Sequence, residues 1–221
     1  MGNPGGGVMS SGSSVSHPLF SRAFAHFAPA ADEAGVAGHR DELLAPLSGR
    51  ALEVGAGTGL NFARYPSSVT DVVAVEPEPY LRARAVEAAS RAPVPVRVVE
   101  AVAEALPFRD GEFDMVVASL VLCSVPDQST ALGELRRVLR PGGELHFYEH
   151  VLADDSALAH LQRRVDLVWP HLGGGCHTSR DTVAAINQAG WRDVSYRQFR
   201  FCPCVLAAPV SPMVIGQATG P

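Results

Sequence analysis

The segment LEVGAGTG, residues 52–59, places three glycines at alternate positions directly after a short apolar run. The run at residues 50–54 predicts a buried strand, and residues 60–65 predict the start of a helix. Glycine tolerates the unusual dihedrals of a tight turn and lets the backbone approach a ligand closely. A strand, a glycine turn and a helix in this order indicate an open α/β sheet that binds a ligand at the carboxyl ends of its strands.

Apolar strand runs and helical patterns alternate through the rest of the chain. Further strands are expected at residues 71–76, 94–99, 113–119, 144–150, 191–201 and 212–218. Further helices are expected at residues 38–47, 78–91, 129–139, 156–168 and 179–189. This order predicts a Rossmann-like, doubly wound α/β fold with a seven-stranded, mostly parallel sheet and an antiparallel last strand. Because two strands follow each other at the end, we expect that pair to form one edge of the sheet.

The chain divides into three regions by composition. Residues 1–16 are rich in Gly and Ser and predict a disordered tail. Residues 17–48 predict a helical cap, in which Phe20, Phe24 and Phe27 recur at helical spacing and would share one face. That stripe is typical either of core packing or of a lid over an active site. Residues 49–221 predict the single domain that binds the ligand.

Composition excludes several functional classes. The formal net charge is -5, which argues against unaided binding to nucleic acid or to an anionic membrane. The chain has no Lys, so a lysine Schiff base is excluded. No apolar run reaches about 18 residues, so no membrane span is expected. The four cysteines lack the spacing of metal ligands, which predicts no metal site and free thiols in a cytoplasmic protein.

Two acidic residues narrow the class of ligand. The glycines follow a G-x-G-x-G pattern, whereas a dinucleotide site prefers G-x-G-x-x-G. Glu53 directly precedes the turn, where its carboxylate would repel a pyrophosphate and attract a cation. Glu76 ends the second strand, near the offset at which an acid binds ribose hydroxyls. S-adenosylmethionine is a phosphate-free nucleoside with an amino group and a sulfonium, so these residues favour it over NAD.

Four segments carry a resemblance to a known family. LEVGAGTG, VVAVEPEP, VAEALPFRDGEFDMVVASLVLCSV and ELRRVLRPGGELHFYEHV resemble the successive motifs of the type-11 class I S-adenosylmethionine-dependent methyltransferases. A narrower similarity, to animal microsomal thiol S-methyltransferases, rests on LVLCSV, RPGGELHFYEHV, residues 175–180 and residues 212–218. The resemblance implies cofactor-binding positions at Glu53, Gly55, Ala56, Gly57, Gly59, Glu76, Pro77, Ala103, Glu104, Ser119 and Leu120.

One position departs from the family pattern. Many members carry an Asp that binds the adenine amino group, and Val102 stands there in this chain. A valine side chain cannot accept a hydrogen bond. Backbone groups of Ala103, or the Glu104 side chain, are the expected substitutes.

The candidate residues for catalysis and for acceptor binding follow the later strands. Methyl transfer depends mostly on alignment, and a protonated nucleophile also needs a base. Glu149, His150 and His177 are candidate bases, with His150 first because it ends the fifth strand, although each could equally have a structural role. We expect Phe20, Phe24, Cys123 and Trp169 to line the acceptor pocket. Cys123 is disfavoured as a methyl acceptor, because no nearby cation in the sequence would lower its pKa.

The prediction from sequence is therefore a methyltransferase acting on a small molecule. The resemblance implies a thiol acceptor, and the alternative is carbon or oxygen methylation of a quinone-like or phenolic compound. An NAD-dependent oxidoreductase and a cofactor-binding relative without activity are the other classes considered. The sequence does not predict the oligomeric state.

Overall fold

The computed structural model describes residues 17–202 and 205–220, so the predicted tail at residues 1–16 lies outside the described residues. The first half contains, in chain order, α1 (Pro18–Ala31), η1 (Asp32–Val36), α2 (Ala37–Leu44), β1 (Gly49–Val54), η2 (Phe62–Arg64), β2 (Val69–Val75), α3 (Pro79–Ala89), β3 (Val96–Val99) and β4 (Phe113–Ser119). The second half contains α4 (Gln128–Val138), β5 (Leu139–His150), α5 (Ser156–Val165), α6 (Trp169–Leu172), α7 (Thr182–Gln188), β6 (Arg192–Arg200), η3 (Val205–Val210) and β7 (Pro212–Thr219).

The strands form a single seven-stranded sheet in the order β3-β2-β1-β4-β5-β7-β6. Strands β1 to β5 pair in parallel, and β7 is antiparallel to both of its neighbours, β5 and β6. The predicted Rossmann-like α/β fold, with a mostly parallel sheet and an antiparallel last strand, is confirmed.

The final two strands form the antiparallel pair expected at one edge of the sheet. Within that pair, β7 lies next to β5 and β6 is the outermost strand. Burial explains the order: most β7 residues are buried, whereas most β6 residues are exposed. The apolar strand therefore takes the position with two neighbours, and the strand rich in Arg takes the edge, where charged side chains also discourage pairing with another chain.

Apolar residues on the two faces of the sheet pack against different helices. One face carries Leu52, Val116 and Phe147, which pack with α4 and with Ile186 of α7. The other face carries Ala51 and Val72, among others, which pack with α2, η2 and α3. The sheet is therefore covered on both faces, as a buried parallel sheet requires.

Two helices differ from the sequence expectation. The helix predicted from residue 60 is only a turn of 3-10 helix, Phe62–Arg64, because Pro66 biases the preceding Tyr65 toward an extended conformation. The helix predicted at 156–168 ends at Val165, and a separate short helix, α6, follows with Pro170 in its first turn.

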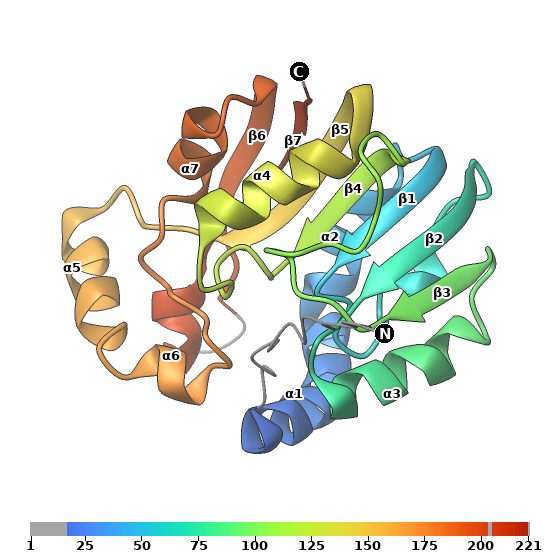
Figure 1. Ribbon diagram of the computed structural model, residues 1–221. Coiled ribbons are helices and arrows are strands. Elements are labelled where there is room, and N and C mark those ends of the chain that lie inside the picture. The colour runs from blue at the N-terminus through green and yellow to red at the C-terminus, as the bar shows by residue number, and fades with distance from the viewer. Residues whose placement is uncertain (1–16, 203–204, 221) are drawn as a thin grey trace, which may run out of the picture.

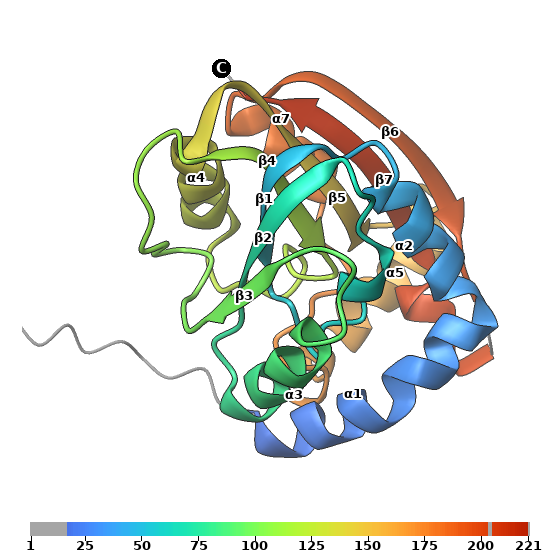
Figure 2. The ribbon, with the colours of Figure 1, turned by 90° about the vertical axis from the view of Figure 1, so that its right-hand side faces the viewer.

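The N-terminal helix lies at the ligand-binding edge of the sheet. The arrowheads of β2 and β4 point toward the side of the molecule where α1 and α3 lie (Figure 1). Viewed from the side, α1 runs next to α3, and α2 continues upward along the face of the sheet (Figure 2). The chain before the first strand thus contributes to the edge where α/β proteins bind ligands.

Candidate active site

A cavity lies at the carboxyl ends of β1, β2 and β4. Its volume is about 1120 Å³, counting the solvent at its mouth. Ligand pockets typically measure about 300–1,000 Å³, so the space suits a nucleoside with an attached side chain. The predicted site residues that line it are Phe20, Phe24, Glu53, Gly55, Ala56, Gly57, Glu76, Pro77, Ala103, Glu104, Ser119 and Leu120.

Five of the predicted site residues do not line this cavity. Gly59 lies beyond the turn and packs against Ala88 of α3. Its φ of 80° favours glycine, and a Cβ at this position would collide with Ala88. The other four are Cys123, His150, Trp169 and His177.

The glycine turn forms one wall of the cavity. Gly55 has a φ of 64°, and a Cβ at this position would collide with the side chain of Val121. The Gly57 amide donates a 2.8 Å hydrogen bond to Oε2 of Glu76. The turn after β1 and the end of β2 therefore hold each other in position.

Glu53 lies at the centre of a buried polar network. Its Oε1 accepts from Asn61 Nδ2 at 2.9 Å, and its Oε2 accepts from the Tyr65 hydroxyl at 2.6 Å. Arg40 donates to Asn61 Oδ1 at 2.8 Å and pairs with Asp32 at 3.0 Å. Burial raises the pKa of Glu53 to about 7, and the hydrogen bonds from Tyr65 and Asn61 oppose that rise. The carboxyl group therefore changes charge near neutral pH.

Sequence reasoning did not include Arg40, Asn61 and Tyr65 in the site. They come from α2 and the η2 turn, and no motif in the sequence links them to Glu53. Arg40 and Asn61 also line the cavity. A buried carboxylate needs partners, and this requirement was the only available signal for them.

Glu76 presents its carboxylate to the cavity from the loop after β2. Oε2 accepts from Gly57, and Oε1 accepts from the Glu78 amide at 3.0 Å. Burial raises the pKa of Glu76, and these backbone hydrogen bonds oppose the rise. Each carboxylate oxygen has a second lone pair, so both can still accept from ligand hydroxyls.

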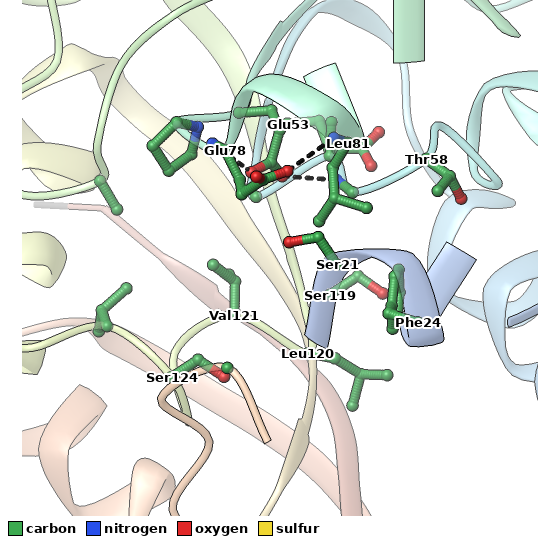
Figure 3. A pocket seen from close by; sticks show the side chains of 18 of the residues that line it. Ser21, Phe24, Glu53, Thr58, Glu78, Leu81, Ser119, Leu120, Val121 and Ser124 are labelled. Atoms are coloured by element: carbon green, nitrogen blue, oxygen red, sulfur yellow. Dashed lines mark hydrogen bonds between the residues drawn. The ribbon is translucent and has the colours of Figure 1, made fainter. Parts of the chain in front are cut away.

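Ser119, at the end of β4, provides a polar group without a partner. Its Oγ is buried and has no hydrogen-bond partner among the described residues. Ser119 lines the cavity (Figure 3). A buried hydroxyl without a partner is costly, which makes Ser119 Oγ a candidate partner for a ligand that enters the cavity. The orphaned hydroxyl, the glycine turn and the two carboxylates fit a polar nucleoside derivative.

Part of the cavity wall is apolar. Pro77, Leu81, Ala101, Val102 and Ala103 form this part of its wall. Val102, where the sequence departs from the expected family pattern, lines the cavity, and its side chain contributes only apolar surface. Glu104 also lines the cavity, and its Oε1 accepts a long, 3.4 Å hydrogen bond from the Asp127 amide.

Helix α1 closes one side of the cavity. Phe20 and Phe24 stack with ring centroids 5.7 Å apart, and Phe24 and Ser21 face the ends of the strands (Figure 3). A Cβ built at Gly57 would lie 3.3 Å from the Phe24 ring. Phe27 was expected on the same face, but it is 65% exposed, so the stripe comprises two rings and not three.

The candidate bases lie elsewhere. Glu149 is fully buried and accepts hydrogen bonds from the amides of Val121, Leu122 and Cys123 at 2.9, 2.8 and 3.1 Å. These bonds hold the loop after β4, so Glu149 has a structural role. His177 lies 3.9 Å from Asp166, and burial lowers the pKa of His177.

His150 lies beside two cysteines instead of the cavity. Its Nδ1 is 3.6 Å from Cys123 Sγ and 3.4 Å from Cys176 Sγ. The contact with Cys176 and burial both raise the pKa of Cys123, which keeps this thiol protonated and a poor nucleophile.

Comparisons with known proteins identify the family. The model of the family described as a methyltransferase domain, type 11, matches residues 52–147. Human thiol S-methyltransferase TMT1B is 37% identical over 177 residues, which cover 76% of this chain and 69% of the human protein. The chain belongs to this family of S-adenosylmethionine-dependent methyltransferases. Human thiol S-methyltransferase TMT1A is 39% identical over 144 residues, which cover 63% of this chain and 59% of the human protein.

Solved structures support the fold of the methyltransferase. A possible histamine N-methyltransferase from Thermotoga maritima superposes with a TM-score of 0.67 at 21% identity, covering 92% of this chain and 98% of that chain. The [4+2]-cyclase SpnF superposes with a TM-score of 0.66 at 20% identity, covering 85% and 80% of the two chains. These likenesses concern the fold alone. The NAD-dependent oxidoreductase considered from the sequence is set aside, because the family is established.

The described residues contain no helix with the length and apolar character needed to cross a bilayer.

Proposed function

We propose that the cavity binds S-adenosylmethionine and that the enzyme methylates a small-molecule thiol. The observation that carries this proposal is the joining of Glu53, Glu76 and the glycine turn in one cavity at the carboxyl edge of the sheet. Carboxylates at that turn suit a cationic, phosphate-free nucleoside by Coulombic sign. The thiol acceptor is supported by the similarity of this chain to the human thiol S-methyltransferases TMT1B and TMT1A.

The residues of the cavity suggest how the cofactor would be held. Glu53 and the backbone of the glycine turn would bind the amino group of the methionine end. Arg40, which lines the same cavity, would face the methionine carboxylate. Glu76 would accept from the ribose hydroxyls, since each of its oxygens keeps a free lone pair.

The adenine ring of the cofactor would lie against the apolar part of the cavity wall. Pro77, Leu81 and Val102 would pack on the adenine ring, with Ala103 and Glu104 beside them as the proposed substitutes for the missing Asp.

When bound, S-adenosylmethionine supplies an electrophilic methyl group with a neutral leaving group. The protein's contribution is then to align the acceptor and to exclude water. Phe20 and Phe24 of α1, with Val121 and Val125, give the cavity an apolar wall that would select apolar or amphipathic acceptors. A thiol needs little help from a base, because a few per cent is already thiolate at neutral pH. This agrees with the absence of His150 and His177 from the cavity lining.

Cofactor binding is tested by calorimetry with S-adenosylhomocysteine. We expect Glu76→Ala to weaken binding by at least about tenfold, because the loss of one charged hydrogen-bond acceptor costs about 1.5–3 kcal/mol. Glu112→Ala, which removes an acid away from the cavity, serves as the matched control. Equal affinity of the wild type and Glu76→Ala would contradict the proposed cofactor site.

Acceptor class is tested separately with labelled S-adenosylmethionine and panels of small thiols, phenols and quinones. We expect label on at least one thiol. Label only on oxygen or carbon of the other panels would replace the thiol proposal with the alternative acceptor and leave the cofactor site intact.

A further inference from the structure

Three potential metal ligands meet behind the wall of the cavity. Cys123 follows β4, His150 is the last residue of β5, and Cys176 lies in the loop after α6. Their ligand atoms, the two Sγ and the imidazole Nδ1, all lie within 4.8 Å of one another. Both cysteines are buried and His150 is half-buried. The cysteines lie far apart in sequence, so the spacing of cysteines along the chain gave no sign of this cluster.

The distances in this cluster match the edges of a tetrahedron around a metal ion. Zn²⁺ binds thiolate sulfur at about 2.3 Å and imidazole nitrogen at about 2.0–2.1 Å, so tetrahedral ligands lie about 3.8 Å apart for two sulfurs and about 3.6 Å apart for sulfur and nitrogen. The two Sγ atoms are 3.6 Å apart. His150 Nδ1 is 3.6 Å from one sulfur and 3.4 Å from the other. All three observed separations agree with these tetrahedral values to within about 0.2 Å.

We propose that Cys123, His150 and Cys176 form a Zn²⁺ site. Two thiolates and a neutral imidazole compensate the charge of the ion, and their soft sulfur and nitrogen donors suit Zn²⁺. Binding releases the two thiol protons to solvent, so no oxidant or reductant is needed. Three protein ligands leave the fourth position for water or for another ligand from solvent.

The surrounding structure holds the ligands in place. Glu149 binds three amides of the loop that carries Cys123, and it directly precedes His150. The His177 amide donates a 2.9 Å hydrogen bond to the Cys123 carbonyl, which ties the Cys176 loop to the Cys123 loop. Ligands fixed by packing and by backbone hydrogen bonds favour metal binding, because little order is lost when the ion enters.

A disulfide between the two cysteines is the rival use of this cluster. A disulfide places its sulfurs about 2.05 Å apart, well short of the observed separation of 3.6 Å. A disulfide would also give no role to the imidazole, whose Nδ1 lies 3.6 Å from one sulfur and 3.4 Å from the other. The geometry therefore favours an ion at the centre of three donors over a bond between two of them.

The site is tested first on the wild-type chain, reduced and freed of metal. We expect one equivalent of Co²⁺ to give the intense thiolate-to-metal charge-transfer band and the visible bands of tetrahedral Co²⁺, and Zn²⁺ to displace it. Zn²⁺ should also protect Cys123 and Cys176 from alkylation without protecting the exposed Cys202. These measurements need no variant, so misfolding of a variant cannot confuse them.

Variants then identify the ligands. Cys123→Ser, Cys176→Ser and His150→Ala should each abolish the tetrahedral spectrum or weaken Zn²⁺ binding at least a hundredfold, while Cys202→Ser should bind as the wild type does. The proposal is overturned if the reduced wild type takes up no stoichiometric metal. It is also overturned if Cys123→Ser/Cys176→Ser retains the Co²⁺ spectrum, or if mass spectrometry finds a Cys123–Cys176 disulfide that forms in place of metal uptake.

Discussion

Burial changes the acid–base chemistry of Glu53. Its pKa of about 7 reflects desolvation, opposed by Tyr65, Asn61 and the charge of Arg40, while the charge of Glu76 raises it further. The folded chain thus retains a proton that the unfolded chain, with a carboxyl pKa of 4.5, releases. The free energy of unfolding should therefore fall as the pH rises from about 4.5 to about 7, by about 3 kcal/mol in total from this group.

Replacing Glu53 by Gln tests this linkage. Gln keeps the size of the side chain but does not ionise, so the variant should gain stability relative to the wild type at pH 8 and show little difference at pH 5. Urea unfolding at the two pH values measures both effects. An identical pH dependence of the two proteins would mean that Glu53 titrates normally.

The same ionisation should control affinity for the cofactor. Since the ionised carboxylate is the form that attracts an ammonium group, affinity for S-adenosylhomocysteine should rise about tenfold between pH 6 and pH 8. Glu53→Gln should bind more weakly and lose most of that rise, because its charge no longer changes. Calorimetry across this pH range gives the comparison.

The sequence predicted single cavity residues where a motif specified both the residue type and its position relative to a strand. The glycine turn, Glu53 and Glu76 follow strands in order, and the structure brings them to one cavity. His150 was assigned to the methyl-transfer site because it ends a strand at the same edge, yet its side chain contacts Cys123 and Cys176 instead. Strand position fixes where a backbone ends, but contacts from the α6 loop decide where the side chain points.

At the scale of elements, α1 differs from the helices that only cover the sheet. It brings Phe20, Ser21 and Phe24 to the cavity, and Phe24 lies over the glycine turn. We expect Phe24→Ala to weaken S-adenosylhomocysteine binding by about five- to tenfold, because burial of a large apolar side chain contributes about 1.5–3 kcal/mol and only part of the ring meets the ligand.

Phe27→Ala is the matched control for this prediction. It removes the same ring from the same helix at a position that is 65% exposed. Its affinity should stay within about twofold of the wild type. Equal losses in both variants would show that the effect comes from the stability of α1 and not from a contact with the ligand.

Helices and strands were predicted well where an apolar pattern in the sequence was flanked by turn-forming residues. The strand expected at residues 113–119 coincides with β4, because an apolar run lies between turn-forming residues. The helix expected from residue 60 failed because apolar residues continue to Tyr65 while Pro66 limits the helix to one turn. Local sequence patterns also do not predict the order of β6 and β7 in the sheet. That order depends on which strand buries more apolar surface when it lies between two neighbours.

At the scale of the whole molecule, the cavity joins segments from the first and the second half of the chain. His17 and Phe20 precede the first strand, and Gly174 lies beyond α6, yet all three line it. Ligand binding should therefore stabilise the molecule as a unit. S-adenosylhomocysteine at about 100 times its dissociation constant should add about 2.7 kcal/mol and raise the Tm by about 5–10 °C.

A thermal-shift titration measures this effect, with NAD as the control ligand. NAD should leave the Tm unchanged, because its pyrophosphate would face the carboxylates of Glu53 and Glu76. A larger shift with NAD than with S-adenosylhomocysteine would contradict the assignment of the cavity.

The insertion of β7 between β5 and β6 has a consequence for biosynthesis. A ribosome delivers the edge strand β6 before the strand that connects it to the rest of the sheet. Until residues 212–219 have emerged from the exit tunnel, β5 has an unpaired edge and β6 has no neighbour to pair with. An exposed strand edge on a nascent chain invites association with other chains, and the pairing of β7 with β5 removes that edge.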